Sequence, residues 1–199
     1  MIRIKFKKCD NLTQFTIPST STYIGDYAFS SCSFLDEITI PLSVTSIGNH
    51  SFEDCINLSK IIIPESIISI GNYAFENCQS LTKMIIPPSV KSIGNNSFED
   101  CKNLKNISIP ESVISIGNNA FENCQSLTKM IIPPSATSIG DYFVLGCFEL
   151  KKITIPNIQK IGKLCFQDYK KITEFIIPLT VTRIYEKAFK NCSSLKKIE

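Results

Sequence analysis

The sequence predicts an α/β solenoid in which about eight repeats of 23 residues stack on one another, and three observations lead to this prediction. Prolines and glycines recur at fixed places in each repeat. Residues 75–89 are identical to residues 121–135, which indicates duplication of a two-repeat block. Cysteines recur every 23 residues, as Cys9, Cys32, Cys55, Cys78, Cys101, Cys124 and Cys147. Residues 1–199 are therefore expected to form one repeat domain.

Each repeat is expected to begin with a short strand. Aligned on cysteine, the unit reads C-x-x-L-x-x-I-x-I-P-x-x-V-x-x-I-G-x-x-A-F-x-x. The L-x-x-I-x-I segment alternates over its last four positions and is rich in β-branched residues, which is typical of a strand. The proline that follows has no amide hydrogen to donate, so the strand ends there. Stacked repeats would align these strands in one parallel sheet.

The second half of each repeat is expected to turn and run back along the opposite side. In V-x-x-I-G, the glycine would permit a backbone turn that a Cβ atom resists. In A-F-x-x-C, the spacing of the apolar residues fits one or two turns of α- or 3₁₀-helix. Because no single repeat can bury its apolar face, the stack as a whole would provide the core.

Two places depart from the repeat pattern. Phe143 and Val144 replace the usual Ala-Phe pair, and the segment 156–161 is one residue short. We therefore expect a kink or an altered loop near 140–162, with Cys165 in the place of the small residue. At Tyr185 the repeat lacks its glycine, so that turn is expected to change conformation or to carry strain.

The nine cysteines are interpreted as core residues. Neighbouring repeats would hold their thiols about 5 Å apart, which is within reach of a disulfide. However, parallel side chains point the same way, and buried cysteine packs as a small apolar group. The spacing includes no CxxC pair and no histidine-containing cluster of the kind that binds a metal, so no metal or other cofactor is expected.

Composition and charge disfavour several classes of function. The net charge is +3 and Arg3 and Arg183 are the only arginines, so a nucleic-acid partner is not expected. No apolar run reaches the roughly 18 residues of a membrane span, and the N-terminal residues do not form a signal peptide. His50, the only histidine, occupies a variable turn position where exposure is expected. Since no carboxylate pair recurs either, catalysis is not expected.

The repeat resembles the BspA-like, or Treponema pallidum-type, subclass of leucine-rich repeats over essentially the entire chain. The resemblance implies a curved, right-handed superhelix with the parallel sheet on its concave face and short helical or irregular segments on its convex face. Members of that family are commonly surface proteins of bacteria and protists that adhere to host cells and extracellular matrix proteins. The family has no catalytic residues to carry over.

We predict a non-enzymatic module that binds a protein through the concave face; an intracellular interaction scaffold of the same fold and a passive spacer are the alternatives. The outward strand positions would place a row of apolar side chains beside a row of lysines, and contiguous exposed apolar groups often mark a partner surface. Alternatively, recent duplication copied Ile and Lys without selection for a ligand. The candidate binding residues are Lys60, Ile62, Lys83, Ile85, Asn106, Ser108, Lys129, Ile131, Lys152, Thr154, Glu174 and Ile176.

The resemblance implies a location at the cell surface, with the cytoplasm as the alternative. The sequence begins and ends within a repeat, and open ends of a solenoid expose apolar core and an unpaired strand edge. We therefore expect the chain to be a fragment, to associate weakly with itself through one end, or to use residues 1–6 as a cap.

Overall fold

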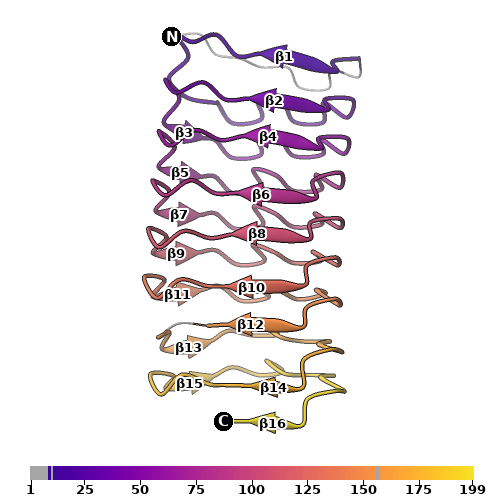
Figure 1. Ribbon diagram of the computed structural model, residues 1–199, viewed down its shortest axis with the longest axis vertical. Helices are drawn as coiled ribbons and strands as arrows, with labels where there is room; N and C mark the ends of the chain where they lie inside the picture. The colour runs from indigo at the N-terminus through magenta and orange to yellow at the C-terminus, as the bar shows by residue number, and fades with distance from the viewer. Residues whose placement is uncertain (1–8, 10, 156) are drawn as a thin grey trace.

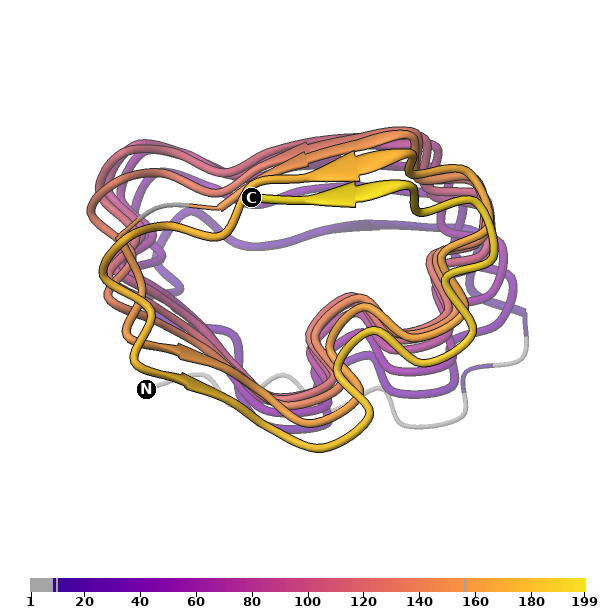
Figure 2. The same cartoon turned by 90° about the horizontal axis from the view of Figure 1, so that it is seen from below.

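The computed structural model describes Cys9 and residues 11–155 and 157–199. The chain winds through successive coils that stack along one axis, with the first and last coils at opposite ends (Figure 1). Viewed along that axis, the coils follow one common outline around a shared interior (Figure 2). The predicted stack of about eight repeats is therefore confirmed, while the curvature and hand of the superhelix stay predictions.

The longer strand of each coil comes from the L-x-x-I-x-I segment, as predicted. Neighbouring strands pair parallel and in register, so that Ile38 lies beside Ile61 and Met84 beside Ile107. The hydrogen-bonded groups are β1–β2–β4, β6–β8, β10–β12 and β14–β16. These strands are β1 (Gln14–Thr16), β2 (Glu37–Thr39), β4 (Lys60–Ile62), β6 (Lys83–Ile85), β8 (Asn106–Ser108), β10 (Lys129–Ile131), β12 (Lys152–Thr154), β14 (Glu174–Phe175) and β16 (Lys197–Ile198).

A second parallel arrangement of strands crosses the other side of the coil, so the prediction of one sheet is wrong. The two residues before the repeat glycine pair with the same residues of the next coil, for example Ile70 with Ile93. A strand of two residues is too short for alternation to reveal it in the sequence. These strands are β3 (Ser46–Ile47), β5 (Ser69–Ile70), β7 (Ser92–Ile93), β9 (Ser115–Ile116), β11 (Ser138–Ile139), β13 (Lys160–Ile161) and β15 (Arg183–Ile184).

The predicted helical turns are absent from the residues described, so that expectation is wrong. Two positions in each A-F-x-x-C region have a positive φ, as at His50 (53°) and Asp54 (59°), and positive φ interrupts a right-handed helix. Alternate amides in this region donate to the next coil: the Phe52 N–H donates to the Ala74 carbonyl at 2.8 Å and the Asp54 N–H to the Glu76 carbonyl at 2.9 Å. Hydrogen bonds between coils thus replace those of a helix. Within the described part of the chain, no helix is long and apolar enough to span a bilayer.

We had expected the repeat glycine to allow an unusual backbone angle. Instead, it permits close stacking of the coils. None of the repeat glycines has a positive φ. A Cβ atom on Gly94 would lie only 2.5 Å from the carbonyl carbon of Gly71 in the preceding coil. Tyr185, whose turn was expected to differ, also avoids positive φ and donates its amide to the Ile161 carbonyl at 3.0 Å, as the glycines do in their coils.

Phenylalanine and cysteine side chains fill the interior. The Phe98 ring is fully buried and stacks between the rings of Phe75 and Phe121, with 5.3 Å between centroids on each side. The Cys101 thiol donates to the Phe75 carbonyl at 3.2 Å, no disulfide links it to a neighbouring coil, and burial raises the pKa of the Cys101 thiol. These contacts confirm that the repeated cysteines are packing residues.

The packing changes near 140–162, where we expected a kink or an altered loop. Phe143 meets Phe121 edge-on at 87°, where the preceding rings stack face to face. Cys165 is buried in the place of the small residue, and Gly146 adopts the positive φ (76°) that Asn or Asp adopts in most other coils. Pro156 in the shortened segment, and the cap expected at residues 1–6, lie outside the described residues.

Candidate protein-binding face

The twelve candidate binding residues are all exposed, and we call the surface they form the strand face. Eleven of them lie on the longer strands, and Ile176 directly follows β14. It is the near side of the stack in Figure 1. The residue between the two outward positions packs on the core: Met84 and Met130 are buried, and Ile61, Ile107 and Ile153 are partly buried. Each strand therefore presents two side chains outward because its central residue is anchored inside. Whether these residues bind a partner stays a prediction.

The charged row of the strand face is less uniformly basic than the sequence suggests. Lys60 forms an ion pair with Glu37 on the neighbouring strand, with 3.4 Å between Nζ and Oε2. Lys129 lies directly beside Lys152, so two like charges are adjacent there. Asn106 interrupts the row in the middle, and Glu174 lies beside Lys197 at its end. The face thus alternates between basic and neutralised segments.

The apolar row of the strand face is also interrupted. Ile62 and Ile85, on adjacent coils, are 49% and 60% exposed, and Ile131 and Ile176 are 50% and 72% exposed. Ser108 and Thr154 separate them, because the polar side chains occupy the same position in the intervening coils. Each of these isoleucines therefore leaves apolar surface in contact with water.

Two grooves cross the strand face where neighbouring strands belong to different hydrogen-bonded groups. The first has a volume of about 280 Å³ and lies between β8 and β10. The second has a volume of about 560 Å³ and lies between β12 and β14. Eight of the twelve candidate residues line these two grooves. Asn106, Ser108, Lys129 and Ile131 line the first, and Lys152, Thr154, Glu174 and Ile176 line the second.

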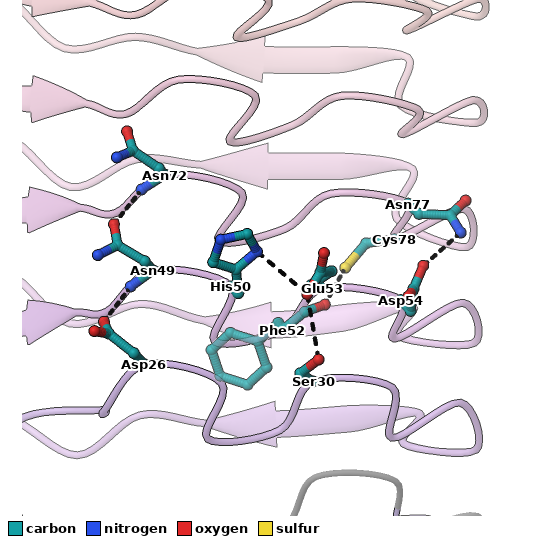
Figure 3. A network of polar contacts seen from close by, with 10 residues as sticks. All are labelled: Asp26, Ser30, Asn49, His50, Phe52, Glu53, Asp54, Asn72, Asn77 and Cys78. Carbon is teal, nitrogen blue, oxygen red and sulfur yellow. Dashed lines mark hydrogen bonds and ion pairs between the residues drawn. The ribbon is translucent and has the colours of Figure 1, made fainter.

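Away from the strand face, side chains at the same place in successive coils form polar ladders that the sequence analysis missed (Figure 3). The Asn49 Oδ1 atom accepts the amide of Asn72 at 2.8 Å, and Asp26 accepts the amide of Asn49 at 2.7 Å. The ladder continues through Asn95 and Asn118 with the same geometry. These side chains satisfy backbone amides beside the repeat glycine, so they stabilise the stack.

His50 is not the exposed turn residue that we expected. Its ring is stacked between Tyr27 and Tyr73, with centroids 4.4 and 4.5 Å away and planes within 5°. Its Nδ1 atom lies 3.2 Å from an Oε2 atom of Glu53. The signal that could have revealed this arrangement is the 23-residue spacing of Tyr27, His50 and Tyr73, which places their rings on consecutive coils.

Glutamates repeat beside this stack and affect one another electrostatically. They are Glu53, Glu76, Glu99 and Glu122, at one position of four successive coils. Burial, together with the neighbouring carboxylates of Glu99 and Glu53, raises the pKa of Glu76 to about 7. Burial and the Glu99 carboxylate also raise the pKa of Glu122, against a hydrogen bond from Asn119 that lowers it.

Comparison with known proteins agrees with the repeat geometry. The family model described as BspA type Leucine rich repeat region (6 copies) matches residues 3–113 and 91–199. Among proteins with curated descriptions, none matches the chain.

Three solved structures show the same architecture. A leucine-rich repeat protein from Bacteroides ovatus ATCC 8483 superposes with a TM-score of 0.90 at 31% identity, over 100% of this chain and 57% of that protein. The Treponema pallidum leucine-rich repeat protein gives a TM-score of 0.79 at 24% identity, over 87% of this chain and 82% of that protein. A leucine rich cell surface protein from Faecalibacterium prausnitzii A2-165 gives 0.53 at 25% identity, over 89% and 63%.

This chain thus spans little more than half the length of the Bacteroides ovatus protein. The family model nevertheless covers nearly all of it, and the superposition includes every residue. The chain therefore belongs to the BspA-type leucine-rich repeat family.

Proposed function

We propose that the chain is a non-enzymatic protein-binding module and that its partner docks on the strand face. The observation that carries this proposal is the pair of grooves, which are lined by eight of the twelve residues selected from the sequence alone. Membership of a leucine-rich repeat family supports it, because repeat solenoids present extended surfaces on which side chains vary over a constant frame.

The chemistry of the second groove indicates the kind of segment it would accept. Lys152 and Glu174 lie on its two walls, and Ile176, which is 72% exposed, adds apolar surface to the wall that carries Glu174. Its volume of about 560 Å³ is within the range of sites that bury several side chains. We propose a protein segment that inserts an apolar side chain and pairs with both charges.

We further propose that the module acts at the cell surface and adheres to a host-cell or extracellular matrix protein. The support is the Faecalibacterium prausnitzii relative, which is described as a cell surface protein, and the family resemblance of the repeat. Labelling intact cells with a membrane-impermeant reagent tests the location. Labelling only after lysis would overturn the surface proposal and favour an intracellular scaffold.

A charge-reversal variant tests the binding face. Lys60, Lys83, Lys129 and Lys152 are replaced together by Glu, and the control replaces Lys91, Lys160, Lys187 and Lys190, which are exposed elsewhere on the solenoid. Both variants change the net charge equally. Binding to a panel of immobilised extracellular matrix and host-surface proteins is then measured for the intact chain and both variants.

The expected result is that the strand-face variant loses a binding partner that the control variant retains. Equal retention by both variants would contradict the strand-face proposal and favour a passive spacer. Equal loss by both would indicate non-specific attraction to charge and would contradict it as well. Circular dichroism of each variant establishes that the coils remain folded.

A further inference from the structure

The side of the solenoid opposite the strand face holds a group of side chains to which no role has been assigned above. His50, Glu53 and Glu76 each offer one ligand atom, and these three atoms all lie within 4.8 Å of one another. The three residues come from two adjacent coils, with Glu76 in the coil after that of His50 and Glu53. Figure 3 shows His50 and Glu53, which are three residues apart in the same coil. Among the described residues, no other group of histidine, cysteine and carboxylate side chains gathers so closely.

We propose that His50, Glu53 and Glu76 bind a divalent transition-metal cation of the zinc class. Imidazole nitrogen and carboxylate oxygen are both zinc ligands, and a site with three protein ligands leaves a fourth position for water. Two ligand atoms on a tetrahedral zinc ion, each about 2.0–2.1 Å from it, lie roughly 3.3 Å apart. The Nδ1 atom of His50 and the Oε2 atom of Glu53 are already 3.2 Å apart.

The neighbouring side chains hold the imidazole in the orientation that the site requires. The stacked rings of Tyr27 and Tyr73 fix the plane of His50, so its Nδ1 atom faces the carboxylates and is screened from solvent. The Ser30 hydroxyl, 2% exposed as a residue, donates to Glu53 at 3.3 Å and orients that carboxylate. Groups that orient ligands in this way strengthen metal binding, because less side-chain freedom is lost when the ion arrives.

Charge also favours a cation here. The stacking of the coils places the Glu53 and Glu76 carboxylates side by side, and Asp54 and Glu99 add further negative charge nearby. A divalent cation between Glu53 and Glu76 would neutralise two like charges that the fold forces together. Glu76 would approach the other two ligand atoms by a rotation of its side chain, since all three residues are only half-buried.

The symmetry of the repeat supplies a matched variant for the test. At the position of His50, the coils on either side carry Tyr27 and Tyr73, so His50→Tyr keeps the aromatic stack and removes the ligand nitrogen. Glu76→Gln removes one carboxylate charge at constant size. Glu111→Gln, at an exposed carboxylate in another part of the coil, is the control.

The experiment titrates the full chain with Zn²⁺ by isothermal titration calorimetry, after treatment with a chelator. We expect one Zn²⁺ per chain, unchanged binding by Glu111→Gln, and affinity at least about tenfold weaker in His50→Tyr and in Glu76→Gln, because loss of a supporting group alone costs that much. Zn²⁺ should also raise the melting temperature of the wild-type chain and not that of His50→Tyr.

Co²⁺ identifies the ligands independently of affinity. With nitrogen and oxygen ligands, bound Co²⁺ shows visible d–d bands without the near-ultraviolet band of a thiolate complex. A thiolate band would place the ion on cysteine and overturn the proposal. So would equal Zn²⁺ affinity in wild-type and His50→Tyr chains, the absence of Zn²⁺ binding, or Ca²⁺ binding as tight as Zn²⁺, since calcium does not select imidazole.

Discussion

Replacing Gly94 by alanine probes how closely successive coils approach. The added Cβ atom would lie 2.5 Å from the Gly71 carbonyl carbon and 2.6 Å from the Asn72 nitrogen. All of these neighbours are backbone atoms, which cannot rotate away as a side chain could. Ordinary contact begins at 3.4 Å, so the two coils would have to separate locally by roughly 0.9 Å.

That displacement would break hydrogen bonds between the coils. The Gly94 amide donates to the Ile70 carbonyl at 3.0 Å, and the Asn95 amide donates to the Asn72 side chain at 2.8 Å. Both distances would exceed the range of a hydrogen bond. Losing two such bonds, and leaving partly buried groups unpaired, costs about 2–4 kcal/mol of unfolding free energy.

Gly25→Ala is the matched control, because Gly25 occupies the same repeat position in the first complete coil. The nearest atom to its added Cβ would be on the Tyr23 side chain, at 3.5 Å. Since the φ of Gly25 suits any residue, the alanine should be neutral or stabilise by about 0.4–1 kcal/mol. The assay is urea unfolding followed by circular dichroism. Equal unfolding free energies for the two alanine variants would refute the argument from close approach.

Three further perturbations test the core, the polar ladder and the glutamate ladder. Phe98→Ala removes a ring stacked on both sides and should lower the unfolding free energy, measured by urea titration, by about 3–5 kcal/mol. Phe34 is exposed, so Phe34→Ala should change the unfolding free energy by less than about 1 kcal/mol. Asn72→Ala should lower the melting temperature through the loss of about 1 kcal/mol, because the Asn95 amide loses its acceptor; an unchanged temperature would contradict this. The raised pKa of Glu122 means that the folded chain holds the Glu122 proton more tightly than the unfolded chain does. The melting temperature should therefore fall as pH rises above 4.5, and it should fall less in Glu122→Gln.

The regular part of the fold is predictable because identical spacing forces identical environments. Once the strand ends at proline and one face is apolar, stacking in register is the arrangement that buries every Phe98 equivalent. The helical prediction failed at A-F-x-x-C, because spacings of three and four residues also suit a turn with positive φ. The Asn and Asp residues before most of the repeated cysteines, such as Asn77, tolerate that φ and were the available clue.

The strand face is easier to predict from the sequence than the group formed by His50, Glu53 and Glu76. Exposure of residues such as Ile85 and Lys129 follows directly from strand alternation. The grooves do not, because alternation along one strand says nothing about the space between neighbouring strands. The arrangement of His50 with Glu76 requires knowing that the side opposite the strand face also stacks in register, since the two residues are 26 positions apart.

The stack is held together by hydrogen bonds that join equivalent positions of adjacent coils. Scalar couplings transmitted through hydrogen bonds can be measured by NMR between an amide nitrogen and the carbonyl carbon that accepts it. We predict a coupling from the Phe75 nitrogen to the Ser97 carbonyl carbon, because the Phe75 nitrogen lies 2.8 Å from the Ser97 carbonyl oxygen. A coupling from Phe75 to the Gly71 carbonyl, as in a helix, would contradict it.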